Sequence, residues 1–64
     1  MSEYERIMLE CRYLLSLNKS YYDLANLFNI SVSDVFDDLN NKLPKIDIRL
    51  YERVNKVLKE NNCL

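Results

Sequence analysis

No glycine occurs among the 64 residues, and the only proline is Pro44. Glycine and proline are the residues that most often interrupt helices, and runs of β-branched residues, which favour strands, are also scarce. The pattern therefore predicts an all-helical chain. Ser2, Ser20 and Ser31 mark where helices begin, because an acidic residue follows each of them at the three-residue spacing of an N-terminal capping box.

The first two helices follow from these caps and from apolar residues at helical spacing. Ser2 predicts a helix that begins near Glu3 and ends at Asn18. Its apolar stripe comprises Tyr4, Ile7, Met8, Cys11, Leu14 and Leu15. Ser20 predicts a second helix, and Asn29 ends it, since asparagine enters the left-handed conformation more readily than most residues. The stripe of this helix comprises Tyr21, Leu24, Ala25, Leu27 and Phe28.

Two further helices complete the predicted bundle. Ser31 opens a third helix, which should end before Leu43 because the residue preceding Pro44 avoids the helical region. Residues 45–46 then form a linker, and Asp47 caps a fourth helix over residues 48–61. The stripes of these helices comprise Val32, Val35, Phe36 and Leu39, then Leu50, Val54, Val57 and Leu58. We expect residues 1–64 to form one domain, an all-α bundle of about four helices with a central helix-turn-helix.

The second and third helices have the spacing of a helix-turn-helix unit. Ala25 is small where two helices would cross closely, Asn29 makes the turn, Ile30 fills the space beneath it, and Val35 lies under the next helix. The spacing alone fits either a plain helical corner or a DNA-reading motif.

The residue inventory argues against several functional classes. Histidine is absent and the only cysteines are Cys11 and Cys63, so we expect no catalytic site, no metal site and no cofactor. Apolar runs reach three residues, far below the roughly 20 of a membrane helix. Glu3 and Glu5 precede every basic residue, which argues against a secretory signal. We therefore expect a cytoplasmic, non-enzymatic protein with reduced thiols, although a bond between Cys11 and Cys63 stays possible.

Several stretches resemble the stage III sporulation protein D family of bacterial transcription regulators. They are DLANLFNISVS at residues 23–33, Val35, Asp38 with Leu39, KLPKID at residues 42–47 and VNKVL at residues 54–58. The Leu-Pro-x-Ile-Asp link after the third helix is the most specific of them. The resemblance covers residues 13–61 and implies a sporulation regulator that places its third helix in the major groove of DNA. Family members also use a basic C-terminal extension, which this chain does not show.

Charge is unevenly distributed along the chain. Residues 1–19 are neutral, residues 20–41 carry a net charge of −4, and residues 42–64 carry +3. Phosphate contacts supply much of the affinity of a protein for DNA, and Lys and Arg make most of them. The predicted recognition helix carries Asp34, Asp37 and Asp38 instead. Its acidity therefore opposes the DNA-binding role that the resemblance implies.

Two functions stay open on these grounds. The first is a regulator that binds double-stranded DNA and reads bases from the third helix, with Asn40 as the best adenine reader. Candidate base contacts are Ser31, Val32, Ser33, Phe36, Asp37 and Asn40, and candidate phosphate contacts are Lys19, Lys42, Lys45 and Arg49.

The second is an acidic adaptor or DNA mimic that docks on a basic protein surface and does not bind DNA. Phe36 would then be an exposed anchor, whereas in a plain bundle it would be core against the first helix. Self-association as a homodimer through Tyr4, Tyr13, Tyr21, Tyr22 and Tyr51 is also possible.

Overall fold

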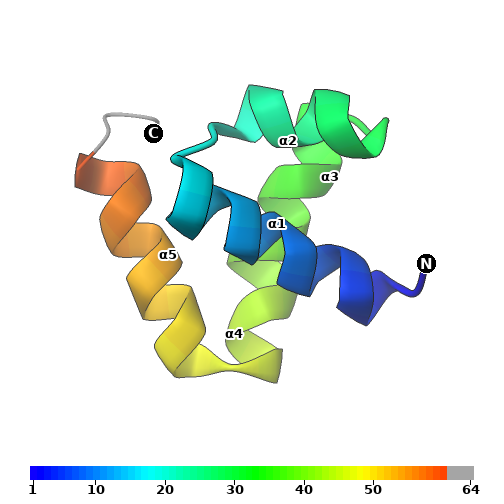
Figure 1. The fold of residues 1–64 in the computed structure, drawn as a ribbon. Helices are drawn as coiled ribbons and strands as arrows, with labels where there is room; N and C mark the ends of the chain where they lie inside the picture. The colour runs from blue at the N-terminus through cyan, green and yellow to red at the C-terminus, as the bar shows by residue number, and fades with distance from the viewer. Residues whose placement is uncertain (61–64) are drawn as a thin grey trace.

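The computed structural model describes residues 1–60 and confirms the all-α fold. Its elements are α1 (Glu3–Leu17), α2 (Tyr21–Phe28), α3 (Val32–Asp37), the π-helical turn η1 (Asp38–Lys42), α4 (Leu43–Ile46) and α5 (Ile48–Glu60). α3, η1 and α4 follow one another as a single helical column, which α1 crosses and α5 flanks (Figure 1). Cys63 and the last residue predicted for the fourth helix, Asn61, lie outside the described residues.

The first three helix starts match the predicted serine caps. Ser2 and Glu5 exchange both bonds of a capping box, and Ser20 and Asp23 do the same. Ser31 makes only half of one: its hydroxyl accepts the Asp34 N–H at 3.0 Å, with no return bond in the described structure. Each cap satisfies a backbone N–H that the first helical turn leaves unpaired.

The turn between α2 and α3 is a Schellman motif. Asn29 is left-handed, with φ 55° and ψ 47°. Its N–H donates to the Asn26 carbonyl at 3.3 Å, and the Ile30 N–H donates to the Ala25 carbonyl at 3.0 Å. This six-to-one and five-to-two pairing satisfies the last carbonyls of α2. The turn predicted from Asn29 is confirmed.

The prediction that the third helix ends before Pro44 was wrong. Leu43 is helical, with φ −57° and ψ −44°, and the chain stays helical to Ile46, so residues 45–46 are no linker. A proline ring collides with the carbonyl four residues earlier and offers no N–H for it. Here the turn is widened: the Leu43 N–H bonds the carbonyl five residues back, on Asp38. A π turn thus gives the column room for Pro44.

Asp47 separates α4 from α5 and caps the latter as predicted, because its Oδ1 accepts the Leu50 N–H at 3.1 Å. The core is formed by buried side chains from α1, α2, α5 and the α3–η1–α4 column: Ile7, Cys11, Leu14, Tyr21, Leu24, Ala25, Val35, Leu39, Leu43, Val54 and Leu58. The predicted stripes also held Tyr4 and Leu27, which are 58% and 55% exposed. No helix within residues 1–60 has the length and apolar character needed to cross a membrane.

Candidate functional site

The outward face of α3 is the first part of the candidate site. Ser33 and Asp34 are exposed in its first turn, Val32 is half-buried, and Ser31 uses its hydroxyl to cap the helix. Because the column continues to Ile46, this face belongs to a helical rod that runs about one turn beyond the end at Leu43 that the sequence predicted. A long rod held at one end by the α2–α3 turn can present several turns to a groove.

Phe36 is not core against the first helix. Its side chain is 50% exposed, and its ring packs on Tyr21 of α2 with centroids 5.7 Å apart. Phe36 therefore remains partly accessible to a ligand. Among the other tyrosines of the chain, Tyr13 and Tyr51 are half-buried, while Tyr4 and Tyr22 are exposed.

Asn40 lies one turn beyond Phe36, and its amide nitrogen is already engaged. Its Nδ2 donates to the Tyr21 hydroxyl at 3.0 Å and to the Phe36 carbonyl at 3.0 Å. An asparagine amide has two N–H donors and one oxygen. Bidentate reading of adenine needs one donor and the oxygen together, so Asn40 would have to give up one of these bonds.

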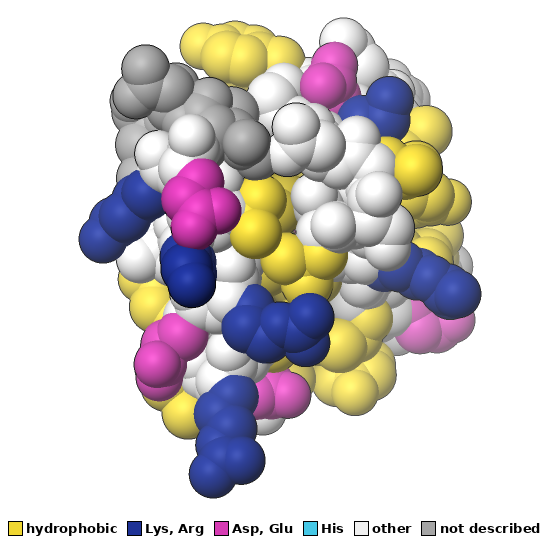
Figure 2. Space-filling view, turned by 60° about the vertical axis from the view of Figure 1, so that its left-hand side comes forward, with side chains coloured by type: hydrophobic (Ala, Val, Ile, Leu, Met, Phe, Trp, Pro, Cys, Tyr) yellow, Lys and Arg dark blue, Asp and Glu magenta, His cyan; other side chains and the backbone are white. Residues whose placement is uncertain are grey.

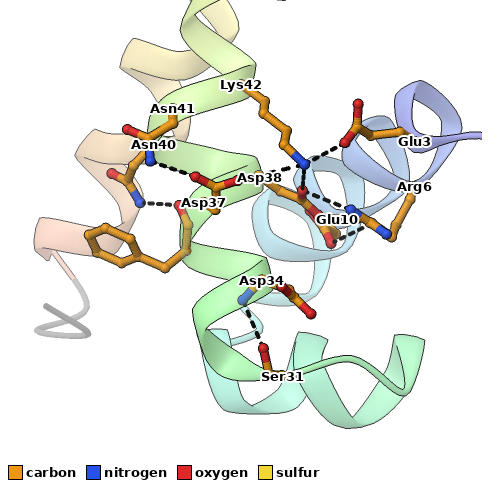
Figure 3. A network of polar contacts seen from close by, with 11 residues as sticks. Glu3, Arg6, Glu10, Ser31, Asp34, Asp37, Asp38, Asn40, Asn41 and Lys42 are labelled. Carbon is orange, nitrogen blue, oxygen red and sulfur yellow. Dashed lines mark hydrogen bonds and ion pairs between the residues drawn. The ribbon is translucent and has the colours of Figure 1, made fainter.

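The aspartates of the column point in different directions (Figure 3). Asp37 is on the outer side, where Asn41 donates to its carboxylate at 2.6 Å. This bond, helped by the charges of Lys42 and Lys45, holds the pKa of Asp37 below its usual value. Asp38 turns inward and is fully buried. The predicted recognition helix therefore shows two aspartates to solvent, Asp34 and Asp37, rather than three.

Asp38 is neutralised by a residue that the sequence did not single out. Arg6 of α1 donates to both carboxylate oxygens, from Nε at 2.9 Å and from Nη2 at 2.8 Å. These hydrogen bonds raise the pKa of Arg6, so its guanidinium stays protonated. Glu10, one turn further along α1, is buried in the same cluster with its Oε2 3.7 Å from Arg6 Nε. The one sequence signal was an acidic residue at helical spacing within the apolar stripe, between Ile7 and Leu14.

The four candidate phosphate contacts fall into two groups. Lys42 forms ion pairs with Glu3, Asp37 and Asp38, and the hydrogen bond from its amine to Glu3 is the main reason that its pKa is raised. Its charge is thus used inside the protein. Lys19, Lys45 and Arg49 are exposed, and no salt bridge joins them to any residue that the structure describes.

Basic and acidic side chains alternate on the face that includes α5 (Figure 2). The exposed charged residues of this helix are Arg49, Glu52, Arg53, Lys56, Lys59 and Glu60. An interleaved surface of this kind attracts an anion less strongly than a continuous basic one. The positive charge of the C-terminal third is therefore partly offset where it meets solvent.

Comparison with known proteins gives one match. The stage III sporulation protein D family matches residues 3–64, which is nearly the whole chain and more than the resemblance in its sequence suggested. No curated protein and no solved structure matches it. A match of this length, together with the helix-turn-helix corner between α2 and α3, shows that the chain belongs to the stage III sporulation protein D family of sporulation regulators.

Proposed function

We propose that this family member binds double-stranded DNA and regulates transcription, with α3 in the major groove. The observation that carries the proposal is the outward face of α3. Asp38, which follows α3, adds no charge to this face, because it is buried and bonded to Arg6. That face keeps Ser33, whose hydroxyl can donate or accept, and Phe36, whose ring can contact a thymine methyl. Asp37 stays available to accept a bond from cytosine N4. Ser31, Val32 and Asn40 are the weaker base contacts, since they are engaged or half-buried.

Three exposed cations are the candidates for phosphate contacts in this proposal. Lys19 precedes α2, Lys45 is on the same helical column as α3, and Arg49 is in the first turn of α5. Each is exposed and outside any salt bridge of the described structure, so each can release counterions on binding DNA. Of the four candidates, Lys42 contributes least to DNA affinity, because it already forms ion pairs with Glu3, Asp37 and Asp38.

The test is fluorescence anisotropy of a mixed-sequence duplex at low salt and then through a salt titration. We expect non-specific binding with a Kd on the order of 10⁻⁵ M that weakens steeply with salt. Lys45→Glu and Arg49→Glu should each weaken binding and lower the salt slope by about one. Lys59→Glu, at the far end of α5, makes the same charge change and is the matched control. Absence of binding by the unaltered protein at low salt would exclude the proposal.

A second function is favoured by one observation, the half-exposed Phe36 on a helix that also shows Asp34 and Asp37 to solvent. An exposed aromatic residue on an acidic helix suits a basic protein surface, since aromatic anchors are common at the centre of interfaces. A lysine-rich peptide is the probe. Asp37→Lys and Phe36→Ala should each reduce its binding, and Glu52→Lys on α5 should not. Peptide binding without DNA binding would replace the first proposal with this one.

A further inference from the structure

Glu10 is a fully buried acidic side chain that accepts no hydrogen bond from any described residue. Its exposed fraction is 0%, and neither Oε atom has a bonded partner in the described structure. The nearest cation is Arg6, whose Nε is 3.7 Å from Oε2 and so beyond hydrogen-bond distance. An ionised carboxylate in such a place loses its hydration and gains little in return.

The neighbouring Asp38, in contrast, accepts hydrogen bonds from a cation. Arg6 directs both Nε and Nη2 to its oxygens, and Lys42 Nζ lies 3.4 Å from its Oδ1 (Figure 3). Asp38 is therefore the ionised member of the pair. Since a carboxylate only accepts hydrogen bonds, any bond between the two acids must use a hydrogen carried by Glu10.

The charges around Glu10 also favour the neutral form. Burial raises the pKa of Glu10 to about 9, and the charge of Asp38 and the hydrogen bond that a protonated Glu10 would give it add to this, whereas Arg6 and Lys42 oppose it. Glu3 and Asp37 also form ion pairs with Lys42. Two cations thus already face three carboxylates before Glu10 is counted.

We propose that Glu10 keeps its proton inside the fold and donates a hydrogen bond to Asp38, so that the two acids and Arg6 form a proton-dependent lock between α1 and η1. Asp38 is the first residue of η1 and directly follows α3, so the lock sets how the outer face of α3 sits on the protein. When Glu10 ionises, its proton passes to water, two carboxylates stand side by side, and the lock opens. The lock does not depend on DNA binding, and it is tested without DNA.

The charged and titratable groups near the lock come from the elements packed against it. Arg6 and Glu3 belong to α1, Asp38 and Lys42 to η1, and Asp37 to α3. Cys11, next to Glu10, has its pKa raised to about 12, mainly by burial and then by Glu10 and by Asp47, which caps α5. The Cys11 thiol therefore titrates above Glu10 and is distinguishable from it.

The experiment is a ¹³C NMR titration of the side-chain carboxyl groups from about pH 4 to about pH 10. We expect Glu10 to titrate several units above the ordinary value for a glutamate, with amide signals of residues 38–42 shifting at the same midpoint. A Glu10 midpoint near the ordinary value of about 4.3 would overturn the proposal.

Two variants separate the lock from simple packing. Glu10→Gln keeps a donor toward Asp38 and cannot titrate, so the alkaline shift of the η1 amides should disappear while the neutral-pH spectrum is retained. Glu52→Gln, exposed on α5, should leave that shift as it is. Persistence of the shift in Glu10→Gln would contradict the proposal. If that variant fails to fold, the carboxyl titration of the unaltered protein decides alone.

Discussion

The two ends of α3 are held in place by different kinds of interaction. At its start, the α2–α3 turn is built from neighbours in sequence: a left-handed Asn29, two backbone bonds and the Ser31 cap. At its end, η1 is held by charges that arrive from α1, since Arg6 lies 32 positions before Asp38. The first arrangement relies on neutral backbone groups, whereas the second relies on the protonation of buried side chains.

The difference predicts two kinds of failure. Neutral backbone bonds at the turn do not change with pH, and each contributes on the order of 1 kcal/mol to stability. A buried ion pair contributes little net stability when intact, yet removing one partner leaves an uncompensated charge in the core. The η1 end should therefore be both the more fragile and the more pH-sensitive part of the column.

The largest effect should come from Arg6→Ala. It leaves Asp38 buried and ionised beside Glu10, with only Lys42 nearby. We expect a loss of about 3 kcal/mol in the free energy of unfolding, measured by urea denaturation at neutral pH. Arg12→Ala, exposed on the same helix, is the control and should change it by less than about 0.5 kcal/mol. Equal losses in the two variants would show that the Arg6–Asp38 pair does not hold η1.

The pH dependence of stability should be carried by Glu10. Folding raises its pKa from 4.5 to about 9, so between these values the unfolded chain has released a proton that the native state keeps. Unfolding then releases a proton, and stability falls as pH rises, by at most about 1.4 kcal/mol per pH unit. Urea denaturation at several pH values should show this decline, and Glu10→Gln should flatten it. An equal slope in both proteins would assign the dependence to another group.

Sequence reasoning succeeded where the physical cause is local. Each serine cap and its acidic partner are three residues apart, and the left-handed Asn29 ends α2 through bonds to Ala25 and Asn26. Such contacts form within a single turn of chain, so their residue types leave a readable pattern.

It failed where the cause comes from a distant element. Nothing near Asp38 indicates that Arg6 will turn it inward, and nothing near Asn40 indicates its bond to Tyr21, 19 positions earlier. The expected acidity of the candidate site was overstated for this reason, since Asp38, paired with the distant Arg6, belongs to the core. The error at Pro44 had a local cause: the rule for the residue before proline ended the helix before Leu43 because it does not consider a π turn.

The α2–α3 turn should respond to backbone geometry. Asn29→Ala places a Cβ-bearing residue without a polar side chain in the left-handed region, at a cost of about 1 kcal/mol, whereas Asn29→Gly should match or exceed the original stability. Urea denaturation at two pH values checks this, because the loss should not vary with pH. Asn18, which is left-handed at φ 56°, offers the same pair of substitutions at the end of α1. A large loss with Asn29→Gly would mean that the asparagine side chain, rather than the backbone, holds the turn.

The smallest effect should be found at the start of α2, where a local contact does carry a charge. The Ser20 N–H and hydroxyl hold the pKa of Asp23 below its usual value, so the ionised carboxylate stabilises the fold above that value and loses this contribution as pH falls through the lowered one. Asp23→Ala should therefore lower the urea midpoint at neutral pH, by less than Asn29→Ala does, and the difference from the unaltered protein should shrink as pH falls below the usual aspartate value of about 3.9. Asp34→Ala is the matched control, because Asp34 has the same place in α3 without a bond back to Ser31. A loss as large for Asp34 as for Asp23 would show that the charge near the helix start matters more than the hydrogen bond, since both carboxylates share the favourable end of a helix dipole.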